Sequence, residues 1–85
     1  MRNILAVFNN RNQTMQFASY LKRLNVRCKT ISTPRELSLS CGLSVLFAEN
    51  GLAQANLILR SYAIYSFVGF YVVSDGVFKN YQRLY

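Results

Sequence analysis

The chain has 85 residues, of which 52% are hydrophobic and 15% are charged. This balance predicts one compact domain over residues 1–85 and excludes a disordered chain, which would have fewer apolar residues. Ten Lys and Arg residues against three Asp and Glu residues give a formal net charge of +7 at pH 7, which favours anionic partners. The cations are scattered along the sequence, so no dedicated nucleic-acid-binding arm is predicted.

The apolar stretches are too short for a secretion signal or a membrane span. The first covers only residues 4–8, and no small-residue cleavage site follows it. The most apolar region, residues 61–73, is shorter than a bilayer crossing requires and contains two serines. We therefore expect a cytoplasmic protein without a membrane partner, in a compartment where thiols stay reduced.

The first third of the sequence predicts a strand, a helix and a second strand. Residues 3–8 form a short apolar run, which is typical of a strand covered on both faces. A loop of asparagines then precedes a helix from Gln13, and Asn25 suits the left-handed position that ends a helix. Residues 26–31 alternate, so we expect a half-buried strand with Cys28 on its inner face, as a small core residue. The predicted buried side of the helix consists of Phe17, Ala18, Leu21 and Leu24.

A third strand and a second helix follow residues 33–42. The strand is predicted from the alternation of apolar side chains over residues 43–47. Glu49 or Asn50 can cap the helix that comes next. The predicted inner side of this helix consists of Leu52, Ala55, Leu59 and Tyr62.

The C-terminal part predicts a hairpin over about residues 67–82. Residues 67–73 are rich in β-branched and aromatic side chains, with Gly69 as a candidate bulge. A Ser-Asp-Gly turn at 74–76 then returns the chain into a strand over 77–81.

This order of elements predicts an α+β fold, a ferredoxin-like βαββαβ two-layer sandwich with an extra C-terminal β-strand. Both helices would cover one face of an antiparallel sheet, and the other face also needs a cover. Apolar and aromatic side chains near the C-terminus would either form a dimer or partner surface there or enlarge the core, and the sequence leaves both alternatives open. These side chains belong to Phe70, Val72, Phe78, Tyr81 and Tyr85.

The connection over residues 33–42, Thr-Pro-Arg-Glu-Leu-Ser-Leu-Ser-Cys-Gly, is longer than a hairpin needs. Thr33 can cap a short helix, Pro34 suits its first position, and Glu36 completes a capping box. The short helix would end near Cys41, where the third strand begins. A bulky, ordered connection with a thiol at its end favours a functional loop.

The reactivity of Cys41 depends on its thiolate. Arg35 and the backbone N–H groups near Gly42 would lower the pKa of Cys41, whereas the C-terminal end of the short helix would raise it. The residues alone therefore leave its reactivity open. The sequence has no histidine, which excludes a Cys-His dyad, and two cysteines are too few for a four-ligand zinc site, so no metal is expected.

Residues 31–43, "ISTPRELSLSCGL", resemble the selenium/sulfur carrier protein-like family, whose pattern is Thr-Pro-Arg-Glu followed by Ser-Cys-Gly. Weaker similarity extends over about residues 3–65. The resemblance implies a ferredoxin-like fold and a carrier thiol, Cys41, that holds sulfur or selenium as a persulfide or selenopersulfide. Donor and acceptor proteins would be the partners, and no cofactor is implied beyond the covalent sulfur or selenium. The residues that would frame the thiol are Thr33, Pro34, Arg35, Glu36, Ser38, Ser40 and Gly42.

The leading interpretation is a carrier rather than a stand-alone catalyst, with Arg35 as electrostatic support for the Cys41 thiolate. An alternative is a non-enzymatic regulatory or binding module that recognises an anionic ligand, RNA or a protein. Nucleic acid is weakly indicated, since Tyr62, Tyr65 and Tyr71 could stack on bases or simply pack. A third alternative is a redox sensor that closes a Cys28–Cys41 disulfide, but it requires Cys28 to be exposed. A homodimer is also left open.

Overall fold

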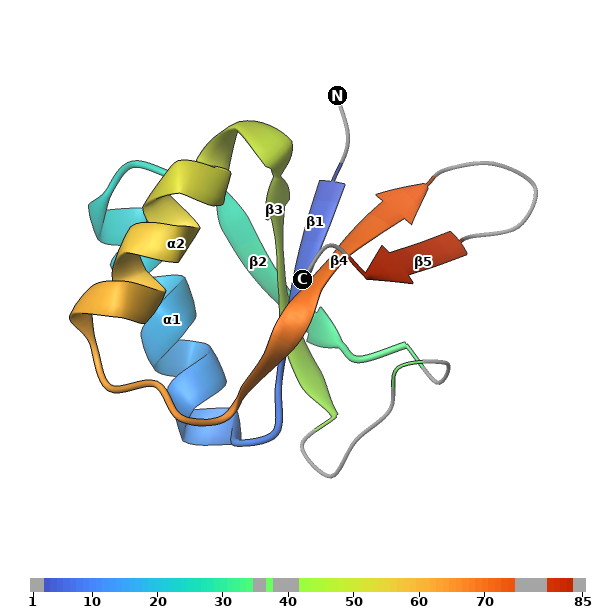
Figure 1. Ribbon diagram of the computed structural model, residues 1–85, viewed down its shortest axis with the longest axis horizontal. Coiled ribbons are helices and arrows are strands. Elements are labelled where there is room, and N and C mark those ends of the chain that lie inside the picture. Colours follow the sequence, from blue (N-terminus) through green and yellow to red (C-terminus); the bar gives the residue numbers. More distant parts are fainter. Residues whose placement is uncertain (1–2, 35–36, 38–41, 75–79, 84–85) are drawn as a thin grey trace.

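The computed structural model describes residues 3–34, 37, 42–74 and 80–83. In this part of the chain, two helices lie on one side of a five-stranded sheet and form a second layer (Figure 1). The elements are β1 (Asn3–Phe8), α1 (Arg11–Arg23), β2 (Cys28–Ser32), β3 (Leu43–Ala48), the 3-10 turn η2 (Glu49–Gly51), α2 (Leu52–Ser61), β4 (Phe67–Ser74) and β5 (Asn80–Arg83).

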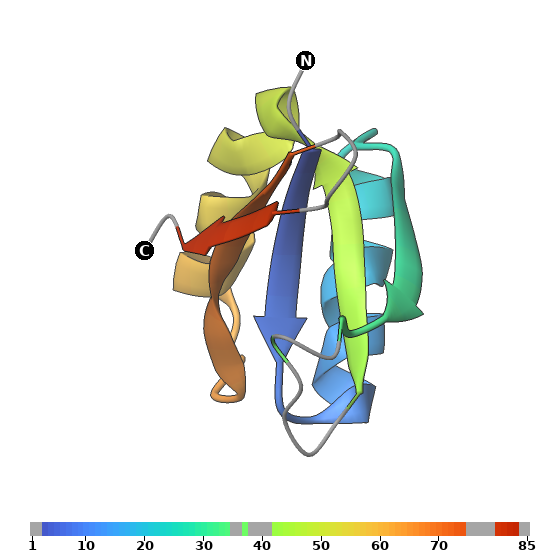
Figure 2. The same cartoon turned by 90° about the vertical axis from the view of Figure 1, so that its right-hand side faces the viewer.

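The strand order in the sheet is β2-β3-β1-β4-β5, and each neighbouring pair is antiparallel. Each helix therefore connects two parallel strands that have a third strand between them, which is the ferredoxin-like α+β arrangement. Figure 2 shows the sheet from the side away from the helices, with β1 between β3 and β4. The predicted fold class is confirmed, and β5 is the predicted extra strand, paired with β4. It runs over Asn80–Arg83 rather than 77–81, and residues 75–79 lie outside the described residues.

Helix α1 begins and ends largely as its sequence predicts. The Asn10 side chain accepts a hydrogen bond from the Gln13 N–H at 3.0 Å, and Asn25 has φ 63°, the left-handed position that follows the helix. The prediction for Leu24 is wrong: it is 40% exposed, because it is the C-cap residue, where the chain has already left the helix. Thr14 lies on the buried side instead. The buried residues of α1 are Thr14, Phe17, Ala18 and Leu21.

The start of α2 differs from the prediction. Gly51 is the N-cap residue, without a side-chain hydrogen bond, and Glu49 and Asn50 belong to the 3-10 turn before it. The reason is packing: Gly51 is buried, and a Cβ atom at this position would lie 2.7 Å from Val26 Cγ1. The chain therefore needs glycine at the closest approach between this turn and the α1–β2 connection.

Replacing Gly51 with alanine is expected to lower the free energy of unfolding by about 1–3 kcal/mol, because the added methyl overlaps the Val26 side chain. Urea denaturation measures the loss. In a Val26→Ala background the same replacement should cost less, since the overlapping methyl is gone. Equal losses in both backgrounds would show that the close contact with Val26 is not the cause.

The inner side of α2 is also slightly different from the predicted one. Ala55 and Ile58 are buried, whereas Tyr62 is the C-cap residue and is 46% exposed. Leu52 and Leu59 are partly buried against the core, as expected for the helix face that contains them.

The core lies between the helices and the sheet and is rich in phenylalanine. Phe17 of α1 contacts Phe8 and Phe47 with ring centroids 5.0 Å and 6.4 Å away. Phe70 and Val72 belong to this core, with exposures of 0% and 6%, so for these two residues the structure agrees with the alternative in which they enlarge the core. Phe78 and Tyr85 lie outside the described residues. That other face holds the buried Leu5 and Val7 of β1.

Strand β4 contains the irregularity that the sequence predicted near Gly69. Val7 pairs with Gly69 but Phe8 pairs with Phe67, so Val68 is the extra residue of β4. The bulge is thus next to the predicted position.

Among the described residues, no helix has the length and apolar character that a membrane crossing requires.

Candidate functional site

The predicted site residues fall into two groups. Thr33, Pro34 and Gly42 lie within the described residues. Leu37, a loop residue that was not predicted as part of the site, is also described. The other five, which include the predicted carrier thiol, lie outside the described residues: Arg35, Glu36, Ser38, Ser40 and Cys41. The geometry that the structure describes is therefore that of the base of the loop, where the chain leaves and re-enters the sheet.

The base of the loop is closed by two contacts between its ends. The Thr33 N–H donates a hydrogen bond to the Gly42 carbonyl at 2.8 Å. The hydroxyl oxygens of Thr33 and Ser44 are 2.6 Å apart and share a hydrogen bond, and Ser44 is fully buried. Since Ser32 also pairs with Leu43, the loop leaves and re-enters the sheet at adjacent points. The sequence did not single out Ser44, because its partner becomes evident only from the β2–β3 register.

Both ends of the loop have defined backbone conformations. The Pro34 carbonyl accepts a hydrogen bond from the Leu37 N–H at 2.9 Å, which forms a turn where the sequence predicts a helical start. Gly42 has φ 73°, in the left-handed region that favours glycine, and a Cβ there would meet no atom within 4 Å. Gly42 is therefore required by its backbone rather than by crowding. Cys41 is the residue before this fixed point in the sequence.

Cys28 lies at the other end of β2 and is half-buried against the core, as predicted. Its Sγ donates a hydrogen bond to the Ala18 carbonyl at 3.5 Å. Burial raises the pKa of the Cys28 thiol above its usual value, and Lys22 lowers it by a smaller amount. The thiolate of Cys28 is consequently disfavoured at neutral pH.

The redox-sensor alternative requires an exposed Cys28, whereas Cys28 is half-buried, and its place in the strand also argues against a Cys28–Cys41 disulfide. In β2, Cys28 and Ser32 are about 13 Å apart along the strand, and Gly42 adjoins the Ser32 end. A disulfide requires Cα atoms within about 7 Å. Cys28 therefore lies far from Gly42, the described residue that follows Cys41 in the sequence.

Alkylation tests the environment of Cys28. In a Cys41→Ser variant, where Cys28 is the sole thiol, iodoacetamide should react several-fold more slowly with the folded protein than with the protein in urea, because the raised pKa and burial both reduce thiolate attack. The stability of the fold should also decline as the pH rises above the usual thiol pKa, since the unfolded chain releases the proton more readily. Equal alkylation rates would contradict the burial of Cys28.

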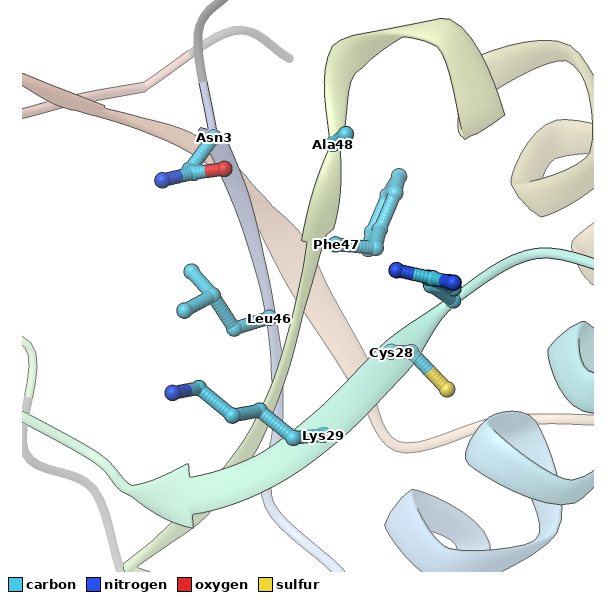
Figure 3. A pocket seen from close by; sticks show the side chains of 7 residues that line it. Asn3, Cys28, Lys29, Leu46, Phe47 and Ala48 are labelled. Carbon is cyan, nitrogen blue, oxygen red and sulfur yellow. The ribbon is translucent and has the colours of Figure 1, made fainter.

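Two adjoining hollows surround the beginning of β2, and the sequence interpretation missed them. One, of about 390 Å³, is lined by Arg27, Cys28 and Lys29 of the β2 segment and by Leu46 of β3 (Figure 3). The other, of about 550 Å³, is lined by Lys22, Asn25, Val26, Arg27 and Cys28. Figure 3 shows the Lys29 and Leu46 side chains on one side of the sheet and the Cys28 sulfur on the other, toward α1. The available signal was the run of cations at 22, 23, 27 and 29 in the sequence.

The tyrosines proposed to stack on bases have different environments. Tyr62 stacks on Tyr20, with centroids 3.9 Å apart and an interplanar angle of 9°, so its ring already has a partner. Tyr65 is 86% exposed, and Tyr71 is half-buried on β4. Within the described residues, no three Cys, Asp or Glu side chains gather in a group that could hold a metal ion.

Comparisons with known proteins give one family. The family described as "Putative Se/S carrier protein-like" matches residues 3–67, which is most of the chain and includes the whole loop over 33–42. No curated protein and no solved structure matches. The matched region ends at the first residue of β4, so most of the terminal hairpin lies outside it.

Proposed function

Because the chain belongs to the Se/S carrier protein-like family, we propose that it carries reactive sulfur or selenium on Cys41 and passes it between partner proteins. The observation that supports this assignment is the environment of Cys28. The chain has two cysteines, and Cys28 is half-buried with a raised thiol pKa. A carrier needs an accessible thiolate, which leaves Cys41, in the loop that carries the family motif, as the residue for this role.

The proposed loading step is an exchange between sulfur atoms. The Cys41 thiolate attacks the outer sulfur of a donor persulfide, a new S–S bond forms on Cys41, and the donor leaves as a thiolate. Unloading is the same exchange with an acceptor thiolate, or with another nucleophile, that attacks the outer sulfur. With selenium, the outer atom is selenium and the carried form is a selenopersulfide. Neither step requires the carrier itself to supply an acid, a base or a metal.

We assign the frame of the thiol to the loop residues around it. Thr33 and Gly42 would hold the base closed through their backbone hydrogen bond, and Pro34 would start the turn that follows. Arg35 would favour the thiolate through its charge, while Glu36, Ser38 and Ser40 would complete the loop as cap and hydroxyl partners. The proposal includes a cytoplasmic setting, where reduced thiols are available.

The test is a loading experiment followed by intact-mass measurement. The purified protein is incubated with a cysteine desulfurase and cysteine, or with a chemical persulfide donor. We expect a mass gain of one sulfur atom per chain that dithiothreitol removes. A chain that gains no sulfur from either a protein persulfide or a small-molecule persulfide, and no selenium from a small-molecule selenopersulfide, would contradict the proposed function.

A further inference from the structure

We propose that the outer edge of β2 is the docking site for an acidic, extended segment of a partner protein, which adds to the sheet as a further strand. The segment would pair its backbone with β2 and direct carboxylates toward the cations around it. The proposal concerns the partner of the proposed carrier and rests on that function for its purpose.

The first support is the position of β2 in the sheet. It is the terminal strand among those that the structure describes, so within this part of the chain only one of its sides is paired, with β3. Figure 2 shows β2 at one side of the sheet, and no described strand lies beyond it. Lys29, Thr30 and Ser32 are exposed. An exposed sheet edge is the surface that strand addition uses, with main-chain hydrogen bonds as the source of affinity.

The second support is charge. Arg27 lies just before β2, Lys29 is the second residue of β2, and Lys22 lies in the last turn of α1. All three side chains are exposed. Among the described residues the single acid is Glu49, in η2. Lysines on a sheet edge oppose pairing with another basic strand, and a second copy of β2 would bring like charges together. An acidic strand is the complementary partner.

The third support is the shape of the surface on both sides of β2. Side chains of an added strand alternate between the two faces of the sheet. On one face they would meet the hollow of about 390 Å³ that contains Lys29 and Leu46, and on the other the hollow of about 550 Å³ that contains Lys22. Arg27 lines both hollows. Each face thus offers a cation to a carboxylate.

The position of this edge connects docking with the loop. Strand β2 ends at Ser32, and Thr33 begins the closed base of the loop over residues 33–42. A partner strand that follows β2 from Cys28 to Ser32 covers about 13 Å and ends beside that base. Docking would therefore bring the partner protein to the end of the sheet from which the loop of Cys41 emerges.

The experiment uses the full chain and fluorescent synthetic peptides. The acidic probe alternates Glu with Val and Thr. The controls are the same peptide with Lys in place of Glu, and the acidic peptide with N-methyl groups on alternate residues, which block one row of backbone hydrogen bonds. We expect saturable binding of the acidic probe alone, measured by fluorescence anisotropy, with amide NMR shifts in Cys28–Ser32. Lys29→Glu should weaken binding about fivefold, whereas Arg60→Glu, on the exposed side of α2, should leave it within about twofold.

Three results would overturn the proposal. Equal binding of the N-methylated peptide would indicate charge attraction without strand addition, and tighter binding of single-stranded oligouridylate would indicate an RNA partner. Self-association through β2 that the acidic probe does not displace would indicate a second copy of the chain as the partner. Docking and carrying are separable. Lys29→Glu should still load sulfur from a small-molecule persulfide, and Cys41→Ser should still bind the acidic probe. Loss of probe binding in Cys41→Ser would also count against an independent docking edge.

Discussion

Replacing Cys41 with serine is expected to abolish sulfur and selenium loading, whereas replacing Cys28 with serine should leave one sulfur atom per chain. The serine hydroxyl cannot form the S–S or S–Se bond that holds the cargo. Cys28 is disfavoured as a carrier because burial raises the pKa of its thiol and its Sγ donates to the Ala18 carbonyl. The measurement is intact mass after incubation with a persulfide donor, followed by peptide mapping of the added mass.

The Cys28→Ser variant is the matched control, since it has the same number of thiols as Cys41→Ser. The more polar hydroxyl at this half-buried position against the core should cost about 1 kcal/mol of folding stability, which circular dichroism and urea denaturation can check. Loading that persists in Cys41→Ser, with the mass mapped to Cys28, would reverse the assignment of the carrier. Loading lost in a correctly folded Cys28→Ser protein would indicate that both thiols take part.

Local signals in the sequence were sufficient for most of the fold. The apolar run over residues 3–8 coincides with β1, and Asn25 takes the left-handed conformation that its side chain favours. The order of elements then allows few topologies, and the ferredoxin-like arrangement joins each pair of parallel strands through a helix. The sequence does not reveal which residues are determined by long-range packing. At the start of α2, the N-cap is Gly51, which lies close to Val26, rather than a residue with a capping side chain.

The aromatic residues of β4 illustrate the effect of a bulge. Phe67 and Phe70 are three residues apart, and a regular strand would place them on opposite faces. Both contact the core, with ring centroids 4.8 Å apart, because the extra residue Val68 lies between them. A one-residue shift changes the face of every residue beyond it. The sequence suggested an irregularity at Gly69 but could not reveal which face would gain the aromatic side chains.

The candidate site was predicted less completely than the fold. The glycine after Cys41 and the turn at Pro34 follow from local rules, and the structure has both. The hydrogen bond between Thr33 and Ser44 joins residues eleven positions apart and depends on the register of two strands. The role of Cys41 itself was indicated by the family motif, since the residues alone gave opposing effects on its thiolate. It stays a prediction, for the loading experiment to decide.

Replacing Phe17 with alanine is expected to lower the free energy of unfolding by about 3–5 kcal/mol. Phe17 is fully buried and connects the helix layer to the sheet, with ring centroids 5.0 Å from Phe8 and 6.4 Å from Phe47. Truncation removes these contacts and leaves a cavity that rigid neighbours fill poorly. Since domains of this kind are stable by about 5–15 kcal/mol, the loss is a large share of the total.

Urea denaturation followed by circular dichroism measures this loss, with Met15→Ala as the matched control. Met15 lies on the same helix but is 51% exposed, so its truncation should change the free energy of unfolding by less than about 1 kcal/mol. If Phe17→Ala cost no more than Met15→Ala, Phe17 could not join the two layers of the core. A large loss in Phe17→Ala, together with undiminished sulfur loading at a temperature where the variant stays folded, would show that the core supports the loop without taking part in its chemistry.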